Sequence, residues 1–134
     1  MAANLTKSTS PKPGLATLSP PPSNQLTLPA ASDLAAGDMV YINSSGQFAK
    51  TNGTSNDALA QWFGMVATAC KSGDPATAYH GVEFYYGASG LTPGARYYVS
   101  ATAGALYDTA TTGGDVPCAF ATSATNVFVM NPRK

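Results

Sequence analysis

Residues 37–48 read GDMVYINSSGQF, and residues 94–106, which start 57 positions later, read GARYYVSATAGAL. Each stretch opens with a glycine, continues through an aromatic and β-branched run, and passes through small turn residues into a second short strand. This order of residues is typical of a β-hairpin. The likeness continues downstream, where residues 65–69 align with residues 119–123. We therefore predict a duplicated hairpin unit whose two halves form related sheets around one core.

Short strand patterns alternate with turn signals along residues 34–134. We expect strands near 38–42, 46–50, 61–68, 76–80, 82–86, 95–99, 104–108, 117–122 and 126–130, with one helical turn near 55–61. A chain of 134 residues is long enough for one domain with its own core. Nine short strands and no amphipathic segment of helical length predict an all-β domain, a single compact β-sandwich or barrel.

Residues 1–33 differ in composition from the rest of the chain. Six of the ten prolines fall there, among serines, threonines and isolated leucines, without one aromatic residue. Because proline removes backbone donors and the stretch has little apolar surface, it is not expected to fold on itself. We predict an extended Pro-rich N-terminal arm over residues 1–33, before a β domain at 34–134; the alternative is a plain disordered tail. The leucines that we expect to anchor the arm on another protein are Leu5, Leu15, Leu18, Leu26 and Leu28.

Charge is scarce and balanced in this chain. Seven basic and seven acidic residues give a formal net charge of zero, and 10% of residues are charged, against about a quarter in typical soluble domains. The basic residues are scattered, so no nucleic acid partner is expected. The apolar runs are far shorter than a membrane span, so no membrane partner is expected either. A neutral, charge-poor surface is poorly protected against association, and we expect part of it to be occupied.

Few side chains are candidates for catalysis or metal binding. A small hydrolase would have to use His80, the one histidine, and no nucleophile elbow lies near it. Cys70 and Cys118 do not have the spacing of a structural zinc site, and residues 1–10 lack the apolar core of a secretion signal, so we expect two free thiols. No facing pair of carboxylates can be identified. We therefore expect no enzyme activity, no catalytic residue, no metal and no cofactor.

Strand aromatics divide between a core and a displayed face. Period-two alternation over 82–86 places Tyr85 opposite the core residues, and over 95–99 it does the same for Arg96 and Tyr98. Tyrosine and arginine with little other charge are typical of buried interfaces. The predicted contact residues for another protein or a second copy are Leu15, Leu18, Leu26 and Leu28 on the arm and Tyr85, Arg96 and Tyr98 on the body.

Three segments of the chain carry a family resemblance. Residues 89–106, SGLTPGARYYVSATAGAL, residues 119–132, AFATSATNVFVMNP, and residues 36–42, AGDMVYI, resemble small structural proteins that decorate or cement the capsids of tailed bacteriophages. The likeness spans roughly residues 33–132 and consists of turn and strand residues, with no catalytic signature. Similar sequence segments occur in some phage fibre and tail-associated proteins.

The resemblance implies a structural function in the phage particle. Such a protein would bind the outer surface of an icosahedral head, after assembly in the host bacterial cytoplasm, and bridge capsomers of the major capsid protein as a homodimer or homotrimer. The alternative is a tail-fibre or receptor-binding module that binds glycans. For that alternative, a sugar-stacking platform would come from Tyr41, Phe48, Trp62, Phe63 and Tyr107.

Overall fold

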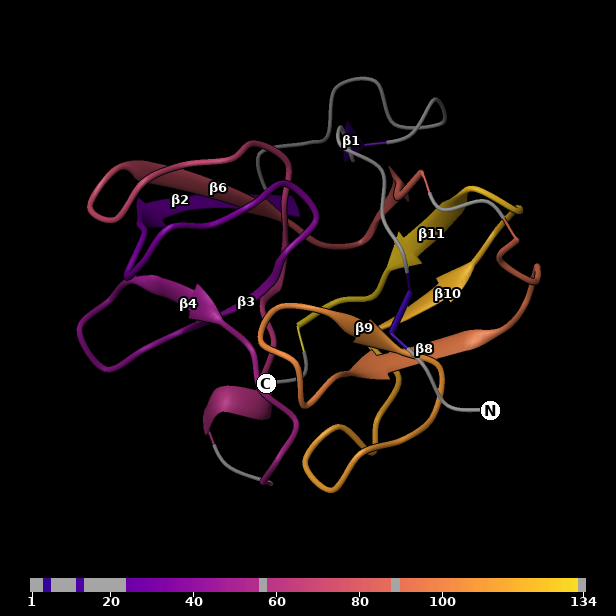
Figure 1. The fold of residues 1–134 in the computed structure, drawn as a ribbon. Helices are drawn as coiled ribbons and strands as arrows, with labels where there is room; N and C mark the ends of the chain where they lie inside the picture. The colour runs from indigo at the N-terminus through magenta and orange to yellow at the C-terminus, as the bar shows by residue number, and fades with distance from the viewer. Residues whose placement is uncertain (1–3, 6–11, 14–23, 56–57, 88–89, 133–134) are drawn as a thin grey trace.

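The protein is all-β, as predicted. The structure is a computed structural model that describes residues 4–5, 12–13 (backbone), 24–55, 58–87 and 90–132. These residues form two antiparallel sheets and one short 3-10 helix, η2 (Ala58–Ala60), with no α-helix among them (Figure 1). Each of the nine predicted strands is present: eight lie inside their expected ranges, several of them two to five residues shorter, and Pro75–Tyr79 begins one residue before its range. Two further strands precede them.

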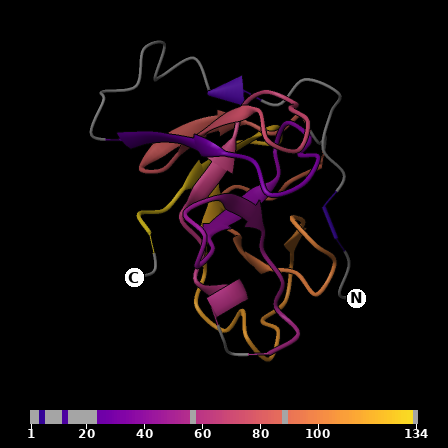
Figure 2. The same ribbon diagram turned by 90° about the vertical axis from the view of Figure 1, so that its left-hand side faces the viewer.

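The first sheet has five strands in the order β2-β6-β5-β3-β4. Its strands are β2 (Gln25–Pro29), β6 (Pro75–Tyr79), β5 (Gly64–Val66), β3 (Met39–Ile42) and β4 (Phe48–Lys50). The second sheet has six strands in the order β1-β7-β11-β10-β8-β9. Its strands are β1 (Lys12–Pro13), β7 (Val82–Tyr85), β11 (Asn126–Val129), β10 (Ala119–Ala121), β8 (Arg96–Val99) and β9 (Leu106–Tyr107). Viewed from the side of the five-stranded sheet, the six-stranded sheet lies behind it (Figure 2).

The strand order reveals that the whole fold is duplicated, beyond the hairpin. Strands β2 to β6 form one sheet in the order 2-6-5-3-4, and β7 to β11 form the other in the order 7-11-10-8-9. Adding five to each strand number of the first sheet gives the second, and β1 is an addition at its edge. We name β2–β6 the first repeat and β7–β11 the second repeat.

The two hairpins are closed by the same local interactions. Asn43 follows β3, and its side-chain Oδ1 accepts the backbone N–H of Ser45 at 3.0 Å. Ser100, 57 residues later, follows β8, and its Oγ accepts the N–H of Thr102 at 3.0 Å. A short polar side chain that binds the backbone two residues onward favours a turn over a continued strand. These residues explain why each strand ends at this point.

Backbone hydrogen bonds correct the predicted alignment downstream of the hairpins. The N–H of Gly37 donates to the carbonyl of Val66 at 2.7 Å, and the N–H of Gly94 donates to the carbonyl of Ala121 at 2.8 Å. Val66 is therefore equivalent to Ala121, whereas aligning 65–69 with 119–123 would pair it with Phe120. A slip of one residue exchanges the two faces of a strand, so this part of the predicted alignment is wrong.

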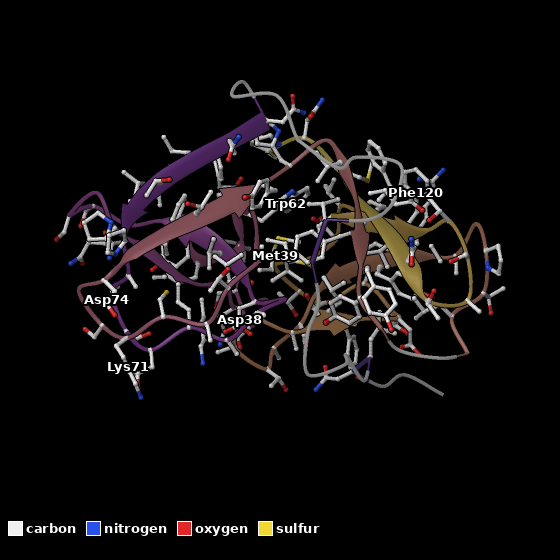
Figure 3. The ribbon with its side chains drawn as sticks, turned by 90° about the horizontal axis from the view of Figure 1, so that it is seen from above. Asp38, Met39, Trp62, Lys71, Asp74 and Phe120 are labelled. Atoms are coloured by element: carbon white, nitrogen blue, oxygen red, sulfur yellow. The ribbon has the colours of Figure 1, made fainter. Side chains whose placement is uncertain are left out.

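Buried side chains form two clusters. The smaller cluster lies inside the first repeat and contains Val40, Phe48, Val66 and Ala78. The larger cluster lies inside the second repeat, and Met39, Trp62 and Met65 of the first repeat join it. In Figure 3, Met39 and Trp62 lie in the middle of the molecule, between the two sheets. Both faces of the first sheet are therefore partly buried. Val40 and Val66 lie on the face inside the first repeat, and Met39 and Met65 lie on the face that contacts the second repeat.

Part of the segment predicted as an arm belongs to the first sheet. Gln25–Pro29 forms β2, which pairs with β6 along its whole length, and Ala30 is fully buried. The expectation that residues 24–33 belong to the arm is therefore wrong: the alternation of Leu26, Thr27 and Leu28 completes a sheet in spite of Pro29, which stands at the end of an edge strand.

Two shorter pieces of the amino-terminal segment also lie against the body. Asn4 bridges to Tyr107, and Leu5 packs against the larger core cluster, so the expectation that Leu5 docks on another protein is wrong. Lys12 pairs with Tyr85 in the backbone register of β1 and β7. Leu15 and Leu18 lie outside the described residues. Among the residues described, no helix is both long and apolar enough to span a membrane.

Candidate interaction surface

The six-stranded sheet has one face turned away from the core, which we call the outer face. Along β7, β8, β10 and β11, buried side chains alternate with partly or fully exposed ones. The strand registers place the exposed side chains on the same side, because residues directly opposite each other in an antiparallel pair share a face. The outer face consists of Glu83, Tyr85, Arg96, Tyr98, Tyr107, Phe120, Asn126 and Phe128.

One row of four side chains crosses the middle of the outer face. Phe120 is paired with Phe128 on one side and with Arg96 on the other, and Phe128 is paired with Glu83. The two phenylalanine rings stack, with centroids 5.3 Å apart and planes at 21°. The row therefore has an aromatic centre, an acid at one end and a base at the other.

The two charges at the ends of this row are held differently. The Oε2 atom of Glu83 accepts hydrogen bonds from Thr122 Oγ1 at 2.8 Å and from Asn126 Nδ2 at 3.0 Å. These neighbours fix the carboxylate in place on the sheet. Arg96 is exposed and forms no ion pair with any residue that the structure describes. A guanidinium in this position is available to a partner that brings a carboxylate.

The structure brings together the body residues that the sequence indicated. Tyr85, Arg96 and Tyr98 all lie on the outer face. The sequence reasoning missed Phe120 and Phe128, which form its centre. The signal was present, because both phenylalanines alternate with residues that the same period-two pattern assigns to the core, namely Ala119 and Ala121 in one strand and Val127 and Val129 in the other.

Of the four leucines predicted as contact residues on the arm, the two that the structure describes, Leu26 and Leu28, lie away from the outer face. Leu26 and Leu28 lie in β2 of the first sheet. Leu26 is 38% exposed, and Leu28 packs partly against the smaller core cluster. Leu28 is therefore in part a core residue, while Leu26 stays a candidate contact on a different part of the surface.

The aromatic residues proposed for sugar stacking do not form a platform. Phe48 is fully buried in the smaller cluster, and Trp62, 2% exposed, is buried in the larger one. Phe63 stacks edge-on against His80 with ring centroids 5.0 Å apart. These rings fill two separate cores, so the predicted platform is wrong.

Among the described residues, the side chain of His80 contacts an aromatic ring and an amide. Besides the contact with Phe63, its Nδ1 lies 3.3 Å from Oδ1 of Asn131. Neither neighbour is a nucleophile or an acid, so these contacts do not assemble a hydrolytic site.

The two cysteines are unpaired thiols. Cys118 is completely buried, and burial raises its pKa to about 12. The pKa of Cys70 is also raised, first by burial and then by the nearby charge of Asp74. A raised pKa disfavours the thiolate that nucleophilic or metal-binding chemistry needs. Within the described part of the chain, no cluster of His, Cys, Asp or Glu is suited to hold a metal ion.

Comparison with known proteins adds no relative. The chain matches no protein-family model and no curated protein sequence.

Proposed function

We propose that this chain is a structural virion protein that binds the outside of an icosahedral tailed-phage capsid and cements neighbouring capsomers of the major capsid protein. Its place would be the outer surface of the capsid, reached after assembly in the host bacterial cytoplasm. The observation that carries this proposal is the outer face, a sheet surface on which the side chains that we named above from β7 to β11 include five aromatic and two charged groups. Such a composition favours adhesion, either to the shell or to a second copy of the chain on that shell, over solvent exposure.

Three further features support a structural function. The resemblance to capsid decoration proteins covers most of the body. The described contacts of His80 and of the two cysteines assemble no catalytic group. The segment before β2 contains five of the ten prolines and the leucines Leu15 and Leu18. A tether of this composition adds contacts that multiply through effective concentration on a repeating lattice.

The direct test measures binding to purified phage heads that lack this protein. We expect the purified chain to co-sediment at many copies per head, in a fixed ratio to the major capsid protein, and to raise the temperature at which heads rupture. Because few charges are available, binding should change little between low and high salt. A protein that stays in the supernatant, or that blocks adsorption to host cells at a few copies per virion, would contradict the cement function; the second result would favour a receptor-binding module.

Two truncations separate the function of the amino-terminal segment from that of the fold. Removal of residues 1–23 should weaken head binding sharply. It deletes the edge strand β1 and the packing of Leu5 but retains β2, so we expect the other ten strands to stay folded with a modest loss of stability. Removal of residues 1–30 also deletes β2 and the buried Ala30, so we expect this variant to be less stable as well. Circular dichroism and thermal melting of both variants provide the control. Full head binding by the shorter truncation would contradict a tethering function of the segment.

A further inference from the structure

We propose that the outer face binds a second copy of this chain, in a two-fold dimer that places Arg96 of each copy against Glu83 of the other. The inference does not depend on capsid binding. It assigns an occupant to the outer face and a geometry to the self-association.

The duplication indicates that this face of the repeat is a contact face. Met39 pairs with Met65 in the first sheet, in the same way that Arg96 pairs with Phe120 in the second. Met39 and Met65 are completely buried, and they pack into the core cluster of the second repeat. At these positions the first repeat thus contacts another copy of the same fold within the chain. The second repeat presents the equivalent positions, Arg96 and Phe120, at the surface.

The charges at the ends of the row select one arrangement of the two copies. A two-fold axis parallel to the strands, above the midpoint between Phe120 and Phe128, turns one sheet over and reverses the row. Each Arg96 then faces a Glu83, and the stacked phenylalanines meet in the centre. An axis perpendicular to the strands would instead oppose like charges, which costs free energy. A two-fold interface uses the same patch on both copies, and this row is complementary to itself.

The carboxylate of Glu83 has a free acceptor for this contact. Thr122 and Asn126 both donate to Oε2. Oε1 accepts no hydrogen bond from any residue that the structure describes. The partner's guanidinium can therefore bind Oε1 without breaking the bonds that hold the carboxylate, and the geometry is fixed before association.

The size of the face indicates a weak dimer. Six strands at ~4.8 Å spacing and about four residues of ~3.3 Å each give a projected area of roughly 380 Å². Stable complexes bury about 800 Å² per partner, so we expect a dissociation constant in the micromolar range or above. Such a dimer forms in concentrated solution, and on a lattice that holds the copies close together.

A charge-reversal experiment tests the arrangement. We expect sedimentation equilibrium to show a concentration-dependent dimer for the intact chain. Arg96→Glu and Glu83→Arg should each raise the dimer dissociation constant at least about tenfold, because both contacts become repulsive. An equimolar mixture of the two variants should associate again, since each heterodimer contact then joins a glutamate to an arginine.

Matched controls separate this result from a loss of folding. Lys71 is exposed and forms an ion pair with Asp33 at 3.7 Å. It lies at the end of the molecule opposite Phe120 (Figure 3), so Lys71→Glu should leave the dimer unchanged. Glu83→Gln keeps an acceptor for Thr122 and Asn126 but removes the charge; it should fold normally and weaken the dimer. Circular dichroism checks each variant.

The outcomes are distinct. A chain that stays monomeric up to about 1 mM, where binding would be weaker than ~4 kcal/mol, overturns the inference. A trimer, single reversals that associate like the intact chain, or a mixture that stays monomeric would also overturn it. A chain that dimerises as described but does not bind phage heads contradicts the proposed capsid function alone.

Discussion

Equivalent positions in the two repeats should respond very differently to the same truncation. Met65 of β5 and Phe120 of β10 occupy the same place in the fold, but Met65 is completely buried between the repeats while Phe120 lies partly exposed on the outer face. Met65→Ala deletes a core side chain and should cost about 2–5 kcal/mol. Phe120→Ala removes the stacking on Phe128, worth about 0.5–1.5 kcal/mol beyond the area that the ring buries, together with a side chain that is already partly exposed. It should therefore cost less than Met65→Ala.

The free energy of unfolding can be followed through one internal probe. Trp62 is the single tryptophan, and it is buried in the same cluster as Met65, so its fluorescence should report loss of the contact between the repeats. Urea unfolding at low protein concentration, where a weak dimer dissociates, gives the two costs directly. For a chain of this size, ~1 kcal/mol corresponds to about 4 °C in the melting temperature. Met65→Ala should therefore melt roughly 8–20 °C lower, and the melting temperature of Phe120→Ala should fall by clearly less. Equal losses for the two variants would refute the assignment of an inner and an outer face.

Two further predictions concern the contact between the repeats and the buried thiol. Gly104 and Gly46 both have positive φ, 76° and 74°, but an added Cβ would lie 3.1 Å from the Asp38 carboxylate at Gly104 and in open space at Gly46. We expect Gly46→Ala to cost about 1 kcal/mol of stability from backbone strain alone, and Gly104→Ala to cost clearly more; equal melting temperatures would contradict the close contact. Burial raises the folded-state pKa of Cys118 to about 12 from an ordinary value of 9.0, so the folded chain holds its proton more tightly and stability should fall as the pH rises from 9 towards 12. In Cys118→Ala, the unfolding free energy should fall with pH less steeply than in the intact chain, by up to about 1.4 kcal/mol per pH unit in that range. An unchanged slope would show that the Cys118 thiol is not the source of the pH dependence.

The sequence predicts strands well in this protein because its turns are local. Asn43 and Ser100 each bind the backbone within their own hairpin, so the strand ends depend on neighbours in sequence. The alignment of the repeats was harder to predict. Gly37 and Gly46 are nine residues apart, but their counterparts Gly94 and Gly104 are ten apart. The next connection differs as well: Phe48 and Val66 are 18 residues apart, but their counterparts Leu106 and Ala121 are 15 apart. Because the connecting segments differ in length, the hairpin alignment does not determine the alignment downstream.

The extent of the arm was mispredicted because composition and pairing point in different directions. Prolines indicated an extended segment, and β2 is extended, but its backbone groups bind β6 over all five residues. Proline is tolerated there because β2 is an edge strand and Pro29 is its last residue. Whether a short polar strand joins a sheet depends on the partner strand, here 50 residues away at Thr77, and this information is not contained in the local sequence.

The candidate site could be predicted only in part for a related reason. Alternation placed Tyr85, Arg96 and Tyr98 on one face, because charged and phenolic groups mark an exposed position. Phe120 and Phe128 carry no polar atom, and phenylalanine in a strand is most often a core residue. Their exposure follows from the arrangement of the repeats: the first repeat buries this face against the second, and no further repeat covers the same face of the second among the described residues. A duplicated fold in a single chain leaves one such face open, and association of two chains through that face would close it.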